Sequence, residues 1–154
     1  MRLWNGWGNE DSDLTMELSN GLRMLLEALV GSGTALPQAT LNDVISKVPD
    51  TRLENHPLIL TDPETRVRHA RGQSLPDWLE MHSGNVDTFP DGVAFPKSSE
   101  QVKELLAHAK ENNLVVIPYG GGTSVVGHIN PEKSARPVLT IDMGKMNSML
   151  SIDT

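Results

Sequence analysis

Residues 115–124 read VVIPYGGGTS, a short apolar run that ends in a proline, a tyrosine and three consecutive glycines. The β-branched residues at its start predict a buried strand. Three glycines in a row form neither a helix nor a strand, because each costs backbone entropy and offers no side chain to pack. They allow positive φ and can present backbone N–H groups to an oxygen-rich ligand. The stretch therefore predicts either an ordinary tight turn or a phosphate-binding loop.

Two well-known phosphate motifs do not fit this loop. Gly122 and Gly127 have the spacing of a Walker A box, but His128 stands where that motif requires lysine. Val125 stands where a dinucleotide-binding fingerprint has its last glycine or alanine. Residues 125–131 contain β-branched residues, glycine and proline, so no helix is expected after the loop. We expect a cradle of loop amides without a strong helix dipole behind it.

The preceding segment predicts a β-α-β unit. Residues 92–95 form a short strand that Pro96 ends, and Ser98 with Gln101 makes a capping box for the helix that follows. Asparagines close that helix before a second strand at 114–117. Because such units are parallel, the glycine loop should lie at the carboxyl end of a parallel strand, where open α/β sheets bind ligands.

After the loop we predict a strand over 138–142, a turn over 143–147 and the start of another strand at 149–152. An unfinished sheet edge is a liability that complete domains avoid. The sequence thus predicts that Thr154 is a truncation rather than a natural domain end.

The first half of the chain predicts short helices. A leucine stripe begins after a cap at Ser19 or Asn20 and stops at Gly31, which suggests a core or docking surface. Further helices begin at Thr40, Asp62 and Ser74. Trp4 and Trp7 are expected to anchor the N-terminal segment on the domain. A basic cluster indicates either an anion site or salt bridges to acids such as Glu64 and Asp77; it comprises Arg66, Arg68, His69 and Arg71.

Residues 118–124, together with 93–96 and 139–143, resemble the first half of the FAD-binding (PCMH-type) domain of the vanillyl-alcohol-oxidase superfamily. Within it, the chain is most similar to the alkylglycerone-phosphate synthase (alkyldihydroxyacetonephosphate synthase) family and bacterial FAD-linked oxidases. Residues 68–75, Pro90-Asp91 and 142–147 also resemble that branch, so the similarity covers 61–154. The expected fold class is α+β, with an N-terminal helical segment (1–88) and the first β-α-β half of the domain (89–154), incomplete at its C-terminus.

The resemblance implies a cofactor and its binding residues. In that family this loop wraps the FAD pyrophosphate through backbone amides and a hydroxyl. Relatives that tether flavin covalently from the loop carry histidine where Thr123 stands, so non-covalent FAD is expected. Carried over to this sequence, two residues shape the approach to the loop and five contact the diphosphate: Pro118 and Tyr119, then Gly120, Gly121, Gly122, Thr123 and Ser124.

The same resemblance places the rest of the enzyme beyond residue 154, including the second FAD-binding half and the cap that binds the small-molecule substrate. Alkylglycerone-phosphate synthases exchange an acyl for an alkyl chain on a dihydroxyacetone phosphate ester, and similar domains serve 2-hydroxy-acid dehydrogenases. The resemblance is also compatible with a homodimer of the full-length protein. We predict no catalytic residue and no metal ligand here, since the five histidines lack metal-site spacing.

Composition excludes several other classes. A net charge of −7 argues against nucleic acid as a partner. The chain has no cysteine and no run near the roughly 20 apolar residues of a membrane span. We therefore expect a cytoplasmic protein without a transmembrane segment. The alternatives to an FAD-dependent oxidoreductase are a non-catalytic nucleotide-binding or interaction module, a non-flavin nucleotide binder, or an FAD-linked 2-hydroxy-acid oxidase.

Overall fold

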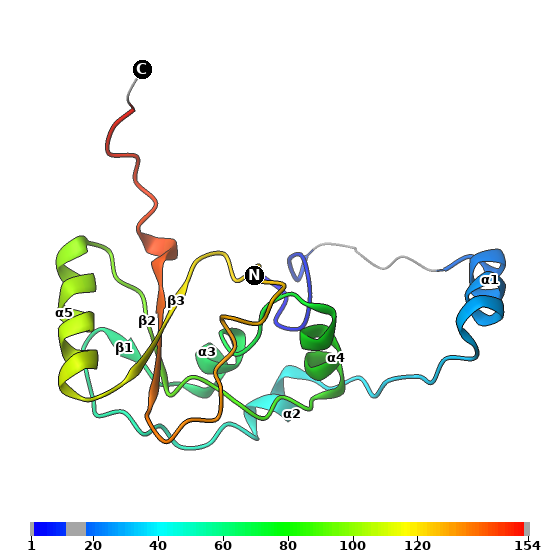
Figure 1. Cartoon of the computed structure of the whole chain (residues 1–154), viewed down its shortest axis with the longest axis horizontal. Coiled ribbons are helices and arrows are strands. Elements are labelled where there is room, and N and C mark those ends of the chain that lie inside the picture. Colours follow the sequence, from blue (N-terminus) through cyan, green and yellow to red (C-terminus); the bar gives the residue numbers. More distant parts are fainter. Residues whose placement is uncertain (1, 12–17, 153–154) are drawn as a thin grey trace.

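A computed structural model describes residues 2–11 and 18–152. The elements follow the order of the chain: α1 (Asn20–Val30), α2 (Leu41–Ile45), β1 (Ile59–Leu60), α3 (Pro63–Arg68), α4 (Leu75–Ser83), β2 (Gly92–Ala94), α5 (Ser99–Glu111), β3 (Val115–Tyr119), β4 (Val138–Asp142) and the 3-10 turn η1 (Met143–Lys145). The mixture of helices and one sheet confirms the α+β fold class (Figure 1).

The four strands form one mixed sheet in the order β1-β2-β4-β3. β4 lies between β2 and β3 and pairs with both in parallel, so the predicted β-α-β unit is split by a later strand. β1 pairs antiparallel with β2, with Ile59 opposite Ala94. Sequence reasoning did not predict β1, because a strand of two residues shows no alternation. The sheet therefore draws on residues from both predicted segments.

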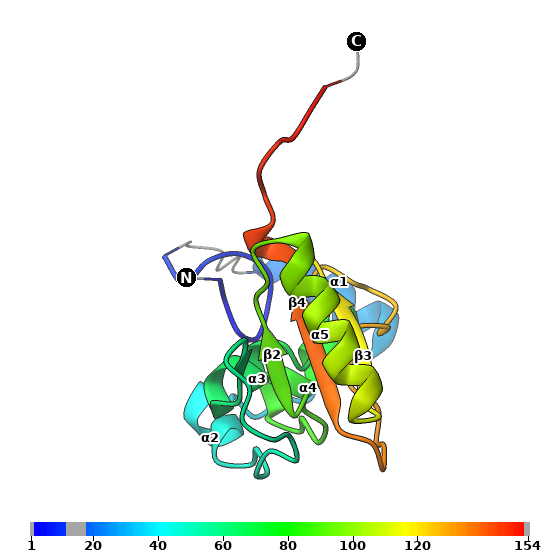
Figure 2. The same cartoon turned by 90° about the vertical axis from the view of Figure 1, so that its left-hand side faces the viewer.

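Helices cover both sides of the sheet. α5 lies on one side, and α2, α3 and α4 lie on the other (Figures 1 and 2). Leu105 and Ala109 of α5 pack with Leu139 and Ile141 of β4 in one buried cluster. A second cluster joins the short helices. Tyr119, at the end of β3, belongs to a third cluster on this sheet.

The predicted helix starts are confirmed. Side-chain oxygens of Ser19, Thr40, Asp62 and Ser74 each accept a backbone N–H bond at the N-terminus of a helix. The capping box at α5 is only half right. Ser98 accepts from the amide of Gln101, but the Gln101 side chain accepts from the amide of Lys97 rather than from that of Ser98.

One prediction near the C-terminal end is wrong, and of the two alternatives for the leucine stripe of α1, core or docking surface, the core is excluded. Residues 149–152 form no strand, because no neighbouring strand offers them hydrogen bonds, and they extend away from the sheet (Figure 1). Thr154, the predicted truncation point, lies outside the described residues. The leucine stripe of α1 is not core: no residue of α1 is buried, and the helix stands apart from the sheet (Figure 1). A leucine stripe fixes an amphipathic helix but not the surface that it covers.

One buried carboxylate ties the middle of the chain to the sheet. Asp91 Oδ2 accepts from Arg52 Nη2 and from the Val138 amide, both at 2.7 Å, and Oδ1 accepts from Arg52 Nε at 2.8 Å. Burial acts to raise the pKa of Asp91, but these hydrogen bonds outweigh it and the pKa lies below its ordinary value. The ionised form is thus the one that the fold stabilises.

We expect Asp91→Asn to lower the free energy of unfolding at neutral pH by about 2 kcal/mol, because an amide has one acceptor oxygen where the carboxylate has two. A lowered folded-state pKa adds stability above the ordinary pKa, and this share disappears as pH falls from about 4 through the lower folded value. Urea unfolding at pH 7 and pH 3 measures both effects. Exposed Glu132→Gln is the control, and equal unfolding curves for Asp91→Asn and the wild type would refute the role of this carboxylate.

Candidate functional site

The glycine loop leaves the sheet at the carboxyl end of β3, as predicted. Pro118 is exposed within this edge strand, where its missing N–H interrupts no central ladder. Tyr119 is buried, and burial raises the pKa of its hydroxyl. From Thr123 to Pro137 the chain has no regular helix or strand, so no helix dipole stands behind the loop. The prediction that no helix follows the loop is confirmed.

The three glycines play different structural parts. Only Gly122 has positive φ, at 68°, and a Cβ there would lie 2.0 Å from the Tyr119 hydroxyl. A Cβ on Gly120 would meet nothing within 4 Å, and one on Gly121 would meet only Thr123 Cγ2 at 3.7 Å. The fold of this chain therefore requires glycine at 122, whereas Gly120 and Gly121 leave their backbone open to an approaching ligand.

The loop has unused hydrogen-bonding groups. Within the described residues, the amides of Gly121, Gly122, Thr123 and Ser124 donate no backbone hydrogen bond. The Oγ of Ser124 is buried without a partner among those residues. Unpaired donors around an open backbone fit a ligand with several acceptor oxygens, such as a diphosphate. The residues present therefore fit the phosphates of the predicted cofactor.

The loop is backed by the segment 72–73. The amide of Gln73 donates to the carbonyl oxygen of Ser124 at 2.6 Å, and the amide of Gly72 donates to Asn130 Oδ1 at 3.0 Å. Asn130 Nδ2 in turn donates to Asp77 Oδ1 at 2.6 Å. These bonds fix the far end of the loop against α4 and its N-terminus.

Gly72 packs tightly against the backbone of the glycine loop. A Cβ at Gly72 would lie 2.3 Å from the carbonyl oxygen of Ser124, a backbone atom that cannot swing aside. We expect Gly72→Ala to displace the loop and to lower the free energy of unfolding by about 1–3 kcal/mol. Thermal unfolding followed by circular dichroism measures this cost. Gly33→Ala, at a glycine whose Cβ would meet nothing within 4 Å, is the control, and equal midpoints for the two variants would contradict the contact.

The N-terminal segment contacts the same loop. This contact was not predicted from the sequence. Arg2 donates from Nη1 to the carbonyl oxygen of Gly121 and from Nη2 to the Tyr119 hydroxyl at 2.7 Å. Arg68 Nη1 donates to the carbonyl oxygen of Arg2 at 2.9 Å. Trp4 packs as the predicted anchor, against the cluster of the short helices, whereas Trp7 is exposed. Arg2 lies more than a hundred residues before the loop in the sequence, so no local sequence pattern predicts their contact.

Two hollows border the loop. The first, of about 280 Å³, is lined on one side by Arg2 and Arg68 and on the other by Tyr119 and Asp142. The second, of about 230 Å³, has Trp7, Gln73 and Thr123 in its wall. Arg2 and Gly121 line both hollows, so they mark the boundary between them.

Buried His69 and half-buried Asp142 form a pair in the first hollow. His69 Nε2 lies 3.0 Å from Asp142 Oδ2, and His69 Nδ1 lies 2.7 Å from the carbonyl oxygen of Thr65. Burial acts to raise the pKa of Asp142, but hydrogen bonds from His69 and from the amide of Gly144 outweigh it and the pKa is lowered. Both ring nitrogens of His69 lie within hydrogen-bonding distance of an acceptor oxygen.

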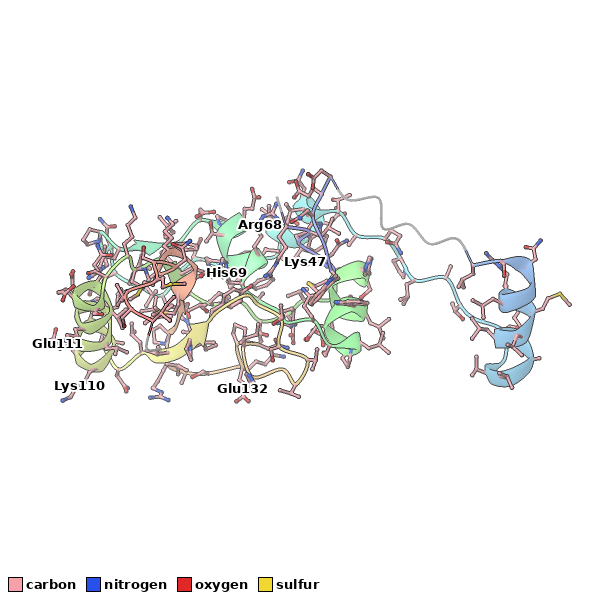
Figure 3. The ribbon with its side chains drawn as sticks, turned by 90° about the horizontal axis from the view of Figure 1, so that it is seen from above. Lys47, Arg68, His69, Lys110, Glu111 and Glu132 are labelled. Carbon is pink, nitrogen blue, oxygen red and sulfur yellow. The ribbon has the colours of Figure 1, made fainter. Side chains whose placement is uncertain are left out.

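The predicted basic cluster does not converge on one anion. Arg66 is buried and donates to the carbonyl oxygens of Pro90 and Pro49, and Arg71 pairs with Glu80 and Asp87. The predicted partner Glu64 does bind Arg68, at 2.9 Å. Asp77 instead caps α4. Arg68 and His69 lie close together at the end of α3 (Figure 3), beside the glycine loop.

Comparison with known proteins finds similarity over part of the chain. Residues 90–154 match the family model described as an FAD binding domain. The chain is 39% identical over 92 residues to an alkyldihydroxyacetonephosphate synthase of Dictyostelium discoideum, covering 60% of this chain and 15% of that protein. It is 31% identical over 77 residues to a mitochondrial D-lactate dehydrogenase [cytochrome] of Saccharomyces cerevisiae, covering 49% of this chain and 13% of that protein.

The fold comparison agrees. A solved alkyldihydroxyacetonephosphate synthase superposes with a TM-score of 0.79 and 27% identity, over 99% of this chain and 33% of that one. The expected resemblance is thereby confirmed, and so is FAD as the cofactor of the matched domain. The chain spans a third or less of the length of these relatives. Among the described residues, no helix is both long and apolar enough to span a lipid bilayer.

Proposed function

We propose that this chain supplies the diphosphate-binding loop of a non-covalent FAD site in an enzyme similar to alkyldihydroxyacetonephosphate synthase. The observation that carries the proposal is the open backbone at Gly120 and Gly121, beside amides that donate no backbone hydrogen bond within the described residues. The match of residues 90–154 to an FAD binding domain supports FAD as the ligand of this loop.

The position and exposure of each loop residue suggest its role in binding FAD. The amides of Gly121 and Gly122 and the exposed hydroxyl of Thr123 would bind the phosphate oxygens. Buried Tyr119 supports the loop from below, because Gly122 packs on its ring. When bound, FAD supplies the redox chemistry that none of these side chains offers. The chain itself binds and orients the cofactor, and Thr123 stands where relatives with covalently bound flavin carry histidine.

The remainder of the site belongs to protein outside these 154 residues in this proposal. The relatives are three or more times longer than the part that this chain covers. The flavin ring, the small-molecule substrate and any dimer contact would then depend on that further protein. We place the start of the FAD domain at residue 89, with β1 of the preceding helical segment (1–88) added to its sheet. We place the parent enzyme in the cytoplasm.

A second candidate is an FAD-linked 2-hydroxy-acid dehydrogenase, which the similarity to D-lactate dehydrogenase favours. The glycine loop serves either reaction equally, because it touches the cofactor and not the substrate. Purified parent enzyme separates the two candidates. Exchange of an acyl for an alkyl chain on a dihydroxyacetone phosphate ester supports the first, and flavin reduction by a 2-hydroxy acid supports the second.

Cofactor identity tests the proposal. The natural gene product that contains these residues is expected to purify with a flavin absorption spectrum. Acid precipitation should release the flavin into the supernatant as FAD, because Thr123 replaces the histidine that tethers flavin in covalently linked relatives. A colourless product that carries another nucleotide would contradict the proposal, and flavin that stays in the acid pellet would contradict its non-covalent part.

A further inference from the structure

The segment 2–9 forms a closed turn against the glycine loop. Arg2 and Asn9 form an isolated antiparallel bridge, and the amide of Leu3 donates to the carbonyl oxygen of Gly8 at 3.0 Å. The side chain of Trp4 packs into the cluster of the short helices. This turn holds the guanidinium of Arg2 over the loop, with its Cζ 5.9 Å from the centre of the Tyr119 ring.

Arg68 positions this segment rather than a ligand. It donates to the carbonyl oxygen of Arg2 at 2.9 Å, and its charge is balanced by Glu64 at 2.9 Å and Glu10 at 3.1 Å. In contrast, within the part of the chain that the structure describes, Arg2 forms no salt bridge with a carboxylate. Arg2 donates there to two uncharged oxygens, those of Gly121 and Tyr119.

The place of Arg2 in the site is specific. It lines both hollows beside the loop, and Gly121 is the loop glycine that lines both with it. A ligand that extends from one hollow to the other across Gly121 therefore passes the guanidinium. In a chain with a net charge of −7, this cation stands beside unpaired loop amides. Guanidinium donors and amide donors together fit a diphosphate, which carries negative charge at its centre.

We propose that Arg2 binds the diphosphate of FAD and adds a positive charge to the amide donors that the loop supplies. This inference rests on the proposed function. The five donors of a guanidinium allow Arg2 to keep its bond to the Gly121 carbonyl while other N–H groups reach a phosphate oxygen. The N-terminal segment thereby becomes part of the cofactor site, although it lies outside the matched domain at 90–154.

The test measures FAD binding to the natural gene product after removal of its flavin. Arg2→Gln keeps a donor for the Gly121 carbonyl but removes the charge, and Arg2→Lys keeps the charge but loses the fork. Arg23→Ala, on exposed α1, removes one positive charge far from the loop and is the matched control. We expect the dissociation constant to rise on the order of tenfold or more in Arg2→Gln, less in Arg2→Lys, and not at all in Arg23→Ala.

Ionic strength separates a charge contact from mere support of the loop. Added salt should weaken FAD binding less steeply in Arg2→Gln than in the wild type, because one charge pair is missing. Wild-type affinity or an unchanged salt dependence in Arg2→Gln would overturn the inference. If Gly121→Val at the same time abolished binding, the proposed function would stand without it. A wild-type product that binds no FAD would overturn both.

Discussion

A Gly121→Val variant of the natural gene product is expected to purify without flavin. A side chain at Gly121 would fill the space through which the loop backbone reaches the phosphates. Gly121 is the informative position because its Cβ would meet only Thr123 Cγ2, at 3.7 Å, so the apo fold has room for this first side-chain atom. The ratio of flavin absorbance to protein absorbance in the purified variant measures the effect.

Controls separate loss of the cofactor from loss of the fold. Gly33→Val makes the same change at a glycine with no atom within 4 Å of the added Cβ, and should keep its flavin. Thr123→Ala removes one hydroxyl contact and should cost about 1–2 kcal/mol of FAD binding, roughly a 5- to 30-fold weaker affinity. A flavin content near the wild-type level in Gly121→Val would refute the role of this loop.

The isolated 154-residue chain is expected to bind FAD weakly or not at all. The two hollows beside the loop have volumes of only about 280 and 230 Å³. The loop residues that line them, Gly120, Gly121 and Thr123, are exposed. Loop amides in open water must compete with hydration of the diphosphate, and association itself costs several kcal/mol, about 4 or more. Calorimetric titration of FAD into the chain measures the affinity.

Sub-micromolar, stoichiometric binding to the isolated chain would show that these residues form a complete site. The proposal that further protein encloses the flavin ring would then be wrong. Adenosine diphosphate serves as the matched ligand, since it carries the diphosphate without the flavin. We expect it to bind the isolated chain no more weakly than FAD does, because the chain offers walls for the phosphates alone.

The local features of the fold could be predicted from the sequence. Ser19, Thr40, Asp62 and Ser74 were assigned as helix starts from side chains that bond within three residues. Strand β4 was predicted with its observed bounds, Val138–Asp142, and its valine, threonine and isoleucine are residue types that strands favour. The loop after β3 followed from its glycines and from the parallel strand before it.

Features that depend on distant residues could not be predicted. Arg2 and Gly121 lie 119 positions apart in the sequence, and no local periodicity predicts contact between such distant residues. The basic cluster divided because its arginines have different tertiary partners: Arg66 donates to two carbonyl oxygens, whereas Arg68 and Arg71 pair with carboxylates. The predicted strand at 149–152 failed for a related reason, since a strand needs a partner that the local sequence does not specify.

Hydrogen exchange at the loop tests the central claim most directly. Peptides covering residues 119–125 of the natural gene product are compared with and without FAD by mass spectrometry. The amides of Gly121 to Ser124 donate no backbone hydrogen bond within the described residues, so they should exchange rapidly in the apo protein. Binding of FAD should slow their exchange markedly, while the exposed helix α1 remains unchanged. Equal exchange of the loop with and without bound FAD would contradict the account.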